Sequence, residues 1–155
     1  MQTERPDTKY RFPCLIGDVG GTNARFAIET AAGRFEAAAV LQNRDFPDFE
    51  SALRHYLQRS ESRAAGSTSA QSAAIAIANP LDGDKVKMTN SGWAFSIEAV
   101  RKTFGFRILR FFNDFTALAM AIPFMPPQAL IQCGGDVPYK DKSSGLIGPG
   151  TGLGV

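Results

Sequence analysis

The segment Ile16-Gly17-Asp18-Val19-Gly20-Gly21-Thr22-Asn23-Ala24-Arg25-Phe26 contains polar residues and glycines that the packing of a hydrophobic core does not require. An apolar run reaches an aspartate, turns through two adjacent glycines and a threonine, and continues as an alternation of apolar and polar residues. Alternation of this kind is typical of strands, whose successive side chains point to opposite faces. The segment therefore predicts a strand, a tight turn and a second strand.

The turn has the residue types of a phosphate and metal site. Adjacent glycines allow positive φ and a close approach to the backbone, so that successive amide N–H groups can face an anion. Thr22 adds a hydroxyl donor, and Asp18 stands at the strand end, where a carboxylate can hold a hydrated cation. The alternative is an ordinary hairpin in which Gly20-Gly21 only makes the turn. The segment matches neither a dinucleotide fingerprint nor a P-loop.

The composition is that of a globular protein. The chain has 155 residues, of which 44% are hydrophobic and 21% charged, enough for one domain or for one domain and part of another. Its net charge of +2 is the remainder of 17 basic and 15 acidic residues spread along the chain. Because no block of like charge is present, we expect no nucleic acid and no membrane as a partner.

The chain carries no obvious membrane or export signal. No apolar stretch approaches the roughly 20 residues needed to span a bilayer. Residues 1–13 lack the apolar centre of a signal peptide, and we expect them to form a flexible tail. Cys14 and Cys133 lack the spacing of a metal site, so we expect two reduced thiols in a cytoplasmic protein.

The rest of the chain predicts a mixed sheet flanked by helices. A third strand over residues 35–41 completes an antiparallel meander, and residues 73–78 have the apolar run of a parallel strand buried on both faces. A further strand is expected over residues 106–112, and the polar residues 59–72 are expected to form a surface loop. One face of the third strand is expected to carry Phe35, Ala37, Ala39 and Leu41.

Helices are predicted from their caps and their apolar spacing. The first begins after Asp48, and the second begins after Ser96 and ends at Gly105. A third is expected over residues 115–122. The single histidine, His55, falls off the apolar stripe of the first helix and is expected to be a solvated surface residue.

Two further groups of polar residues are candidates for ligand contacts. Asn113-Asp114 follows a predicted strand directly, and ligands of open α/β sheets bind beyond the carboxyl ends of strands. The alternative is a helix cap, although two cap-forming residues are more than one helix needs. Asn90-Ser91 is the second group and borders Trp93, which is itself expected in the core.

A second glycine-threonine turn, Gly148 to Gly154, resembles the first in a loose way. Two such turns facing each other would clamp a triphosphate, with Asp18 on a hydrated magnesium ion. Phosphoryl transfer to an alcohol then needs one carboxylate to accept the hydroxyl proton. We expect Asp114 to be this base and Asn113 to anchor a sugar hydroxyl.

Four motifs together closely resemble the bacterial glucokinases of the hexokinase and actin-like superfamily, in the family's order and from about Leu15 to Val155. They are Ile16 to Arg25, Met88-Thr89-Asn90 with Trp93-Ala94-Phe95, Asn113-Asp114-Phe115-Thr116-Ala117, and Gly150-Thr151-Gly152-Leu153-Gly154.

The resemblance implies an α/β fold of the ribonuclease-H-like kind, in which the meander and the parallel strands form one mixed sheet. It implies ATP as the phosphoryl donor, Mg²⁺ held through water by Asp18, and glucose bound by Asn113 and Asn90 and deprotonated at its 6-hydroxyl by Asp114. It implies a cytoplasmic transferase of glycolysis that is a homodimer at full length. The implied nucleotide-binding residues are Gly17, Asp18, Val19, Gly20, Gly21, Thr22, Gly150, Thr151 and Gly152.

The resemblance also implies a domain organisation. After the tail of residues 1–13, a small α/β domain is expected over residues 14–124 and the start of a second domain over residues 125–155. The family's remaining sugar contacts, its adenine pocket and a C-terminal helix that returns to the small domain are expected after Val155. We therefore expect the 155-residue chain alone not to phosphorylate glucose.

Three alternatives remain open. Another sugar kinase of the superfamily would act on fructose or an N-acetylated hexosamine, and its zinc-binding cysteines would follow Val155. A sugar-responsive repressor of the same fold needs an N-terminal helix-turn-helix, for which the 14 residues through Cys14 leave no room. A non-catalytic sugar- or nucleotide-binding module would keep the same turns.

Overall fold

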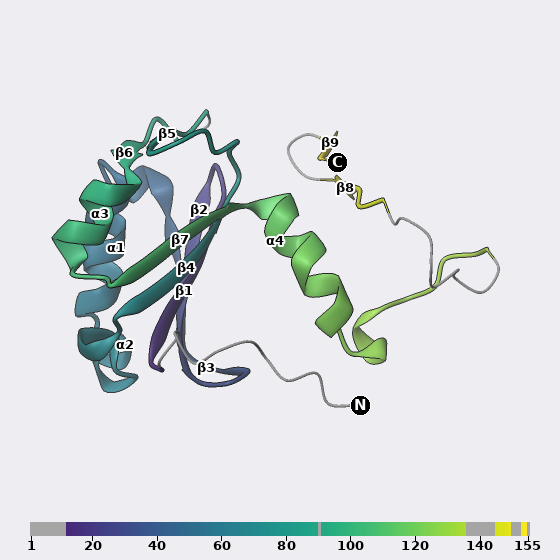
Figure 1. The fold of residues 1–155 in the computed structure, drawn as a ribbon, viewed down its shortest axis with the longest axis horizontal. Helices are drawn as coiled ribbons and strands as arrows, with labels where there is room; N and C mark the ends of the chain where they lie inside the picture. Colours follow the sequence, from purple (N-terminus) through teal and green to yellow (C-terminus); the bar gives the residue numbers. More distant parts are fainter. Residues whose placement is uncertain (1–11, 90, 136–144, 150–152, 155) are drawn as a thin grey trace. The chain divides into compact units, whose positions relative to one another are not determined.

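A computed structural model describes residues 12–89, 91–135, 145–149 and 153–154 of the chain (Figure 1). Its backbone divides into two compact units, Met1–Asp114 and Phe115–Val155. The domain boundary expected after residue 124 stays a prediction. The tail expected over residues 1–13 lies outside the described residues except for its last two.

The first unit is built on a five-stranded sheet in the order β3-β2-β1-β4-β7 (Figure 1). Strand β1 (Cys14–Val19) pairs antiparallel with β2 (Asn23–Ala31), which pairs antiparallel with β3 (Arg34–Gln42). Strands β4 (Ser72–Ile77) and β7 (Ile108–Asn113) run parallel to β1. The predicted meander and parallel strands are therefore confirmed as one mixed sheet.

Helices α1 (Phe49–Gln58), α2 (Ser60–Ala64) and α3 (Ile97–Phe104) gather on one face of this sheet (Figure 1). An antiparallel ribbon of β5 (Lys85–Lys87) and β6 (Ala94–Ser96) leads from β4 into α3. Two 3₁₀ turns complete the unit, η1 (Asn43–Asp45) and η2 (Ser67–Ser69).

The core lies between the sheet and the helices. Phe49 of α1 is fully buried, and its ring stacks on Phe95 at 4.6 Å and meets the edge of Trp93 at 6.1 Å between centroids. The expectation that Trp93 is a core residue is confirmed, because only 2% of it is exposed. His55 is exposed on the surface, as its position off the apolar stripe predicts. The fully buried side chains of the sheet include Leu15, Val19, Ile28, Ile75 and Ile77.

The expectation that Phe35 shares a face with Leu41 is wrong. The pairing of β2 with β3 shifts between Phe26 and Ile28, and Ala37 has a φ of 53°. Such a bulge inserts an extra residue, and a one-residue shift moves later side chains to the opposite face. Leu41 is consequently buried, whereas Phe35 is 56% exposed.

The expectation of a surface loop over residues 59–72 is also wrong. This stretch forms α2 and η2 and begins β4. Ser62 and Ser67 are buried, and the Ser67 hydroxyl donates to the carbonyl oxygen of Leu57 at 2.9 Å. Small side chains that bond to backbone let this segment pack closely against α1, which periodicity alone does not reveal.

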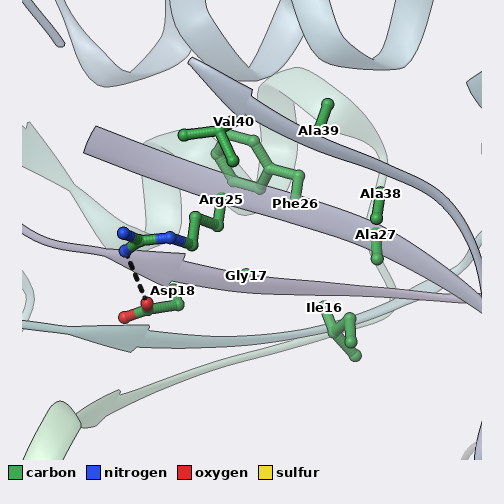
Figure 2. Close-up of a pocket in the computed structure, with 9 residues that line it drawn as sticks. All are labelled: Ile16, Gly17, Asp18, Arg25, Phe26, Ala27, Ala38, Ala39 and Val40. Atoms are coloured by element: carbon green, nitrogen blue, oxygen red, sulfur yellow. Dashed lines mark hydrogen bonds and ion pairs between the residues drawn. The ribbon is translucent and has the colours of Figure 1, made fainter. Parts of the chain in front are cut away.

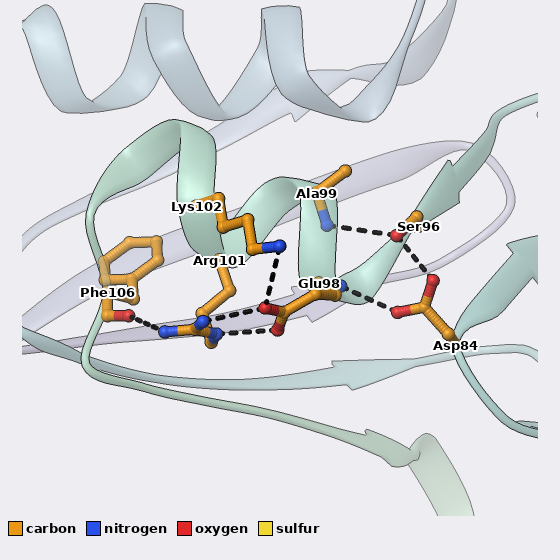
Figure 3. Close-up of polar contacts among 7 residues, drawn as sticks. All are labelled: Asp84, Ser96, Glu98, Ala99, Arg101, Lys102 and Phe106. Carbon is orange, nitrogen blue, oxygen red and sulfur yellow. Dashed lines mark hydrogen bonds and ion pairs between the residues drawn. The ribbon is translucent and has the colours of Figure 1, made fainter.

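The predicted helix caps are confirmed. Asp48 Oδ1 accepts from the Ser51 N–H at 2.7 Å, and Ser96 Oγ accepts from the Ala99 N–H at 3.0 Å. Gly105 ends α3 in the left-handed conformation with a φ of 71°. A second cap comes from Asp84, whose carboxylate accepts from the Glu98 N–H at 2.8 Å and from the Ser96 hydroxyl (Figure 3).

The second unit is apolar but carries no core in its described part. Helix α4 runs Asp114–Ala121 and continues as the 3₁₀ turn η3 (Ile122–Phe124), close to the predicted range of residues 115–122. A turn η4 (Pro127–Ala129) and a two-stranded ribbon of β8 (Gly148–Pro149) and β9 (Leu153–Gly154) follow. None of the residues with a described side chain after Asp114 is buried. No helix among the described residues is long and apolar enough to cross a membrane.

Candidate active site

The carboxyl ends of the three parallel strands β1, β4 and β7 lie side by side at one end of the sheet, which we call the site edge. Val19 of β1 is the register partner of Ile77 of β4, which in turn is the partner of Asn113 of β7. Adjacent strands lie about 4.8 Å apart, so β1 and β7 are separated by roughly 10 Å. The glycine turn after β1 and the Asn113-Asp114 pair after β7 therefore lie at the same edge, two strands apart.

The glycine turn is held by two kinds of contact. The Gly20 N–H donates to the Asn23 carbonyl oxygen at 2.9 Å and closes the turn. From the end of β3, the Asn43 side chain donates through Nδ2 to the Gly20 carbonyl oxygen at 2.8 Å, and the Asn43 N–H donates to the Thr22 carbonyl oxygen at 2.9 Å. Within the described chain, the N–H groups of Gly21 and Thr22 donate to no protein acceptor. These two amides are the donors that the turn can offer an anion.

The positive φ that the two glycines permit is not used here. Neither Gly20 nor Gly21 is among the described residues with positive φ. A Cβ at Gly20 would meet only the Asn23 carbonyl oxygen, at an ordinary 3.6 Å. The lack of a side chain leaves the backbone of the turn open to a ligand.

Gly17 and Val19, two of the predicted nucleotide-binding residues, lie in β1 on the side that faces the core. A Cβ at Gly17 would lie 3.0 Å from Phe26 Cδ1 and 3.3 Å from Ile75 Cγ2. Val19 is fully buried, and its carbonyl oxygen accepts from the Ala78 N–H at 2.9 Å. Both residues have a packing role that accounts for their identity, and their contact with a nucleotide stays a prediction.

Asp18 lies on the opposite face of the sheet and forms an ion pair. Arg25 is its direct partner on β2, and Arg25 Nη1 lies 3.1 Å from Asp18 Oδ2, with about half of each side chain exposed. Figure 2 shows the guanidinium reaching across the two strands toward Asp18. Beside the pair is a groove of about 360 Å³ whose lining includes Ile16, Ala27 and Val40. Among the described residues, no cluster of three or more metal-ligating side chains occurs.

Asn113 and Asp114 form the other half of the site. Asn113 Nδ2 donates to Asp114 Oδ1 at 3.1 Å, and it lies 3.5 Å from the carbonyl oxygen of Asn79. Asn79 is buried in the loop after β4, and its own Nδ2 donates to the Pro80 carbonyl oxygen at 2.7 Å. The loop after β4 thus helps to orient Asn113, and Asp114 is the first residue of α4.

A small polar cavity of about 170 Å³ adjoins the glycine turn. Its lining brings Gly21 and Thr22 together with Asn43, Arg44 and Ser91. Ser91 Oγ contacts Met88 Sδ at 3.3 Å and accepts weakly from the Trp93 N–H at 3.4 Å. The predicted sugar-binding segment therefore borders the predicted phosphate turn. Asn90 itself, together with Gly150, Thr151 and Gly152, lies outside the described residues.

Three contributors to the site are missing from the sequence-based predictions. Arg25 is detectable by counting outward from the turn, because a hairpin over residues 14–31 pairs it with Asp18. Asn43 and Asn79 give no such signal. Asn43 lies 23 positions from the glycine whose carbonyl it binds, and Asn79 lies 34 positions from Asn113.

The mixed five-stranded sheet, with its parallel strands ending in register, defines a ribonuclease-H-like α/β domain with a glycine turn after its first strand. The family model for glucokinases matches residues 15–155, and the chain belongs to this family. It is 51% identical over 155 residues to a glucokinase of Chromobacterium violaceum and 48% identical over 150 residues to one of Neisseria meningitidis. These matches cover 100% and 97% of this chain but 42% and 44% of the relatives, so the chain spans less than half of their length.

Solved structures agree with this assignment. A glucokinase from an Antarctic psychrotroph superposes with a TM-score of 0.77 at 33% identity, over 93% of this chain and 45% of that protein. A glucokinase from Balamuthia mandrillaris, solved in complex with glucose, has a TM-score of 0.53 at 21% identity over 70% of this chain and 31% of its own. Because the second structure is only 21% identical to this chain, it supports the fold alone.

Proposed function

We propose that the protein to which this chain belongs transfers the γ-phosphoryl group of ATP to the 6-hydroxyl of glucose. The observation that supports this most is the common register of Val19, Ile77 and Asn113, which brings a phosphate-type turn and a carboxylate to one sheet edge. The glucokinase names of the relatives that are about half identical to this chain favour glucose over fructose and N-acetylated hexosamines as the acceptor.

The glycine turn binds phosphate oxygens in this proposal. The amides of Gly21 and Thr22, which donate to no acceptor among the described residues, donate to these oxygens together with the Thr22 hydroxyl. Gly17, Val19 and Gly20 shape the backbone that presents these donors. The second glycine motif, Gly150-Thr151-Gly152, supplies donors from the second unit. Backbone amides suit this task because they carry fixed partial charge without a flexible side chain.

The residues fit a magnesium ion that keeps most of its water. Mg²⁺ in nucleotide sites is held by one or two carboxylates together with substrate phosphates. Asp18 supplies one half-exposed carboxylate at the strand end, and its ion pair with Arg25 uses Oδ2, so Oδ1 can accept from a metal-bound water. When bound, the ion neutralises charge on the transferred phosphoryl group.

Asp114 accepts the proton in the chemical step. As the glucose 6-oxygen forms its bond to the γ-phosphorus, the hydroxyl proton passes to the Asp114 carboxylate, and the bond from phosphorus to the bridging oxygen breaks to release ADP. Asn113 and Asn90 hold sugar hydroxyls, so that the 6-hydroxyl is positioned for in-line attack. The hydrogen bond from Asn113 to Asp114 orients the carboxylate.

The 155-residue chain alone is proposed to be inactive. None of the residues with a described side chain after Asp114 is buried, so no core in that part supports the second glycine motif. At full length we propose a cytoplasmic homodimer, as the family resemblance implies.

The test is glucose 6-phosphate formation by the full-length protein, followed with a coupled dehydrogenase. Asp114→Asn keeps the size of the side chain and removes the base, and it should lower kcat by about 10²- to 10⁴-fold. Glu61→Gln is the matched control, since α2 precedes the amino end of β4 and lies away from the site edge. If Asp114→Asn keeps kcat within twofold of the wild type, the assigned role of Asp114 is wrong.

A further inference from the structure

Asn43 joins two segments that are far apart in the sequence. It is the first residue of η1, directly after β3, and only 4% of it is exposed. Its side chain and its backbone N–H bind the carbonyl oxygens of Gly20 and Thr22, at 2.8 Å and 2.9 Å. One buried residue therefore contacts the carbonyl groups on both sides of the open part of the turn.

These contacts determine where the amide of Gly21 points. The Gly20 carbonyl and the Gly21 N–H belong to one planar trans peptide group, in which the C=O and N–H bonds point in opposite directions. Because Asn43 Nδ2 holds the Gly20 oxygen, the Gly21 N–H is directed away from Asn43. The second bond, to the Thr22 oxygen, prevents the other end of the turn from rotating.

The side-chain oxygen of Asn43 indicates that folding stability does not explain why this position is an asparagine. Its Oδ1 is buried and has no hydrogen-bond partner among the described residues. A buried acceptor without a partner is destabilising, so an asparagine at this position is not the best choice for stability alone. Its amide donor is the part that the turn uses.

We propose that Asn43 is the positioning residue of the phosphate turn and that it sets the affinity for the nucleotide by aiming the Gly21 amide at a phosphate oxygen. This inference rests on the proposed function. It predicts a defect in nucleotide binding, with glucose binding unaffected, because the hydrogen bonds that Asn43 donates within the described residues go to the turn.

Asn43→Ala removes the Nδ2 donor and leaves the backbone N–H in place. In the full-length protein we expect the KM for MgATP to rise on the order of tenfold, the KM for glucose to stay within twofold, and kcat to fall less than threefold. Calorimetry with magnesium and the β,γ-imido analogue of ATP should show the same loss of affinity without turnover.

Ser67→Ala is the matched control. It too removes a buried hydrogen bond from a side chain to a backbone carbonyl, that of Leu57, but η2 lies at the amino end of β4 and away from the site edge. It should lower the melting temperature and leave the KM for MgATP unchanged. Asn43→Ser, too short to reach the Gly20 oxygen, is the second variant and should reproduce the shift if the alanine variant is too unstable to assay.

The outcomes separate the two proposals. If the wild type neither binds the analogue nor phosphorylates glucose, the proposed function fails, and the role of Asn43 with it. If the wild type is active and both Asn43 variants lose stability as Ser67→Ala does while keeping the wild-type KM for MgATP, Asn43 has only a structural role and the inference is overturned.

Discussion

Arg25 and Asp18 stand directly opposite each other on neighbouring strands, with Arg25 Nη1 3.1 Å from Asp18 Oδ2. The pair lies on the sheet face opposite the buried side chains Leu15 and Val19 of β1, and about half of each side chain remains exposed. An ion pair of this exposure contributes at most about 1 kcal/mol to folding. The main effect of the ion pair is therefore to hold the Asp18 carboxylate at the end of β1, beside the glycine turn.

Asp18→Asn should separate stability from catalysis. The neutral amide keeps the shape of the side chain and loses the charge that we propose binds a hydrated magnesium ion. We expect the melting temperature of the full-length protein to change by less than 2–3 °C, consistent with about 1 kcal/mol or less. We expect kcat/KM for MgATP to fall on the order of 100-fold.

A second exposed ion pair offers the control for this experiment. Arg34 Nε lies 2.9 Å from Glu36 Oε1, and both residues belong to strand β3. Glu36→Gln should have an equally small effect on the melting temperature and none on kcat/KM. If kcat/KM for MgATP falls equally in the two variants, the proposal that Asp18 binds the magnesium ion is wrong.

Gly17→Ala should destabilise the fold. The added Cβ would lie 3.0 Å from Phe26 Cδ1 and 3.3 Å from Ile75 Cγ2, in a part of the core where both neighbours are packed. Overpacking of this kind costs typically 1–3 kcal/mol, measurable by urea unfolding. Gly20→Ala is the contrast, since its Cβ would meet only an ordinary 3.6 Å contact with the Asn23 oxygen. A Phe26→Leu change should partly rescue Gly17→Ala, and its failure to do so would show that the ring is not the source of strain.

The cap of α3 should make stability depend on pH in acid. Hydrogen bonds from the Arg101 guanidinium lower the pKa of Glu98 from its ordinary 4.5 to about 2. Hydrogen bonds from the Ser96 hydroxyl and the Glu98 N–H lower the pKa of Asp84 (Figure 3). A carboxyl with a lowered pKa stabilises the folded state above its unfolded pKa, and this contribution is lost as pH falls through the folded pKa.

Glu98→Gln should therefore flatten the fall of the melting temperature between pH 4.5 and about 2, the interval between the two pKa values of Glu98. Circular dichroism melts at intervals of half a pH unit would measure the slope. Asp82→Asn removes an exposed acid from the loop that contains Asp84 and is the control. An identical slope in the wild type and Glu98→Gln would rule out this contribution.

The two cysteines should differ in reactivity. Burial, with a smaller effect of the Glu29 charge, raises the pKa of the Cys14 thiol from 9.0 to about 11, and only 5% of Cys14 is exposed. Cys133 is exposed. Because the thiolate is the reactive form, iodoacetamide at pH 8 should label Cys133 in the native protein and Cys14 only after denaturation. Peptide mass spectrometry would locate the label, and rapid native labelling of Cys14 would contradict the buried position.

Features that depend on neighbours in the chain were predictable from the sequence. Alternation and the glycine turn predicted β1 and β2, and short polar residues before apolar spacing predicted the caps Asp48 and Ser96. The position of Asn113-Asp114 at a strand end followed from the apolar run before it. In each case the deciding interaction lies within a few residues, so the local pattern contains it.

Features that depend on distant segments were decided by packing. The bulge at Ala37 moved Phe35 to the exposed face, and the register of β1, β4 and β7 brought Val19 and Asn113 to one edge. Asn43 reached the glycine turn from the end of β3, and Asp84 capped α3 from beyond its own helix. Such contacts form only once the sheet and helices have packed, because the free energy that selects a register comes from burial of whole faces rather than from any single residue.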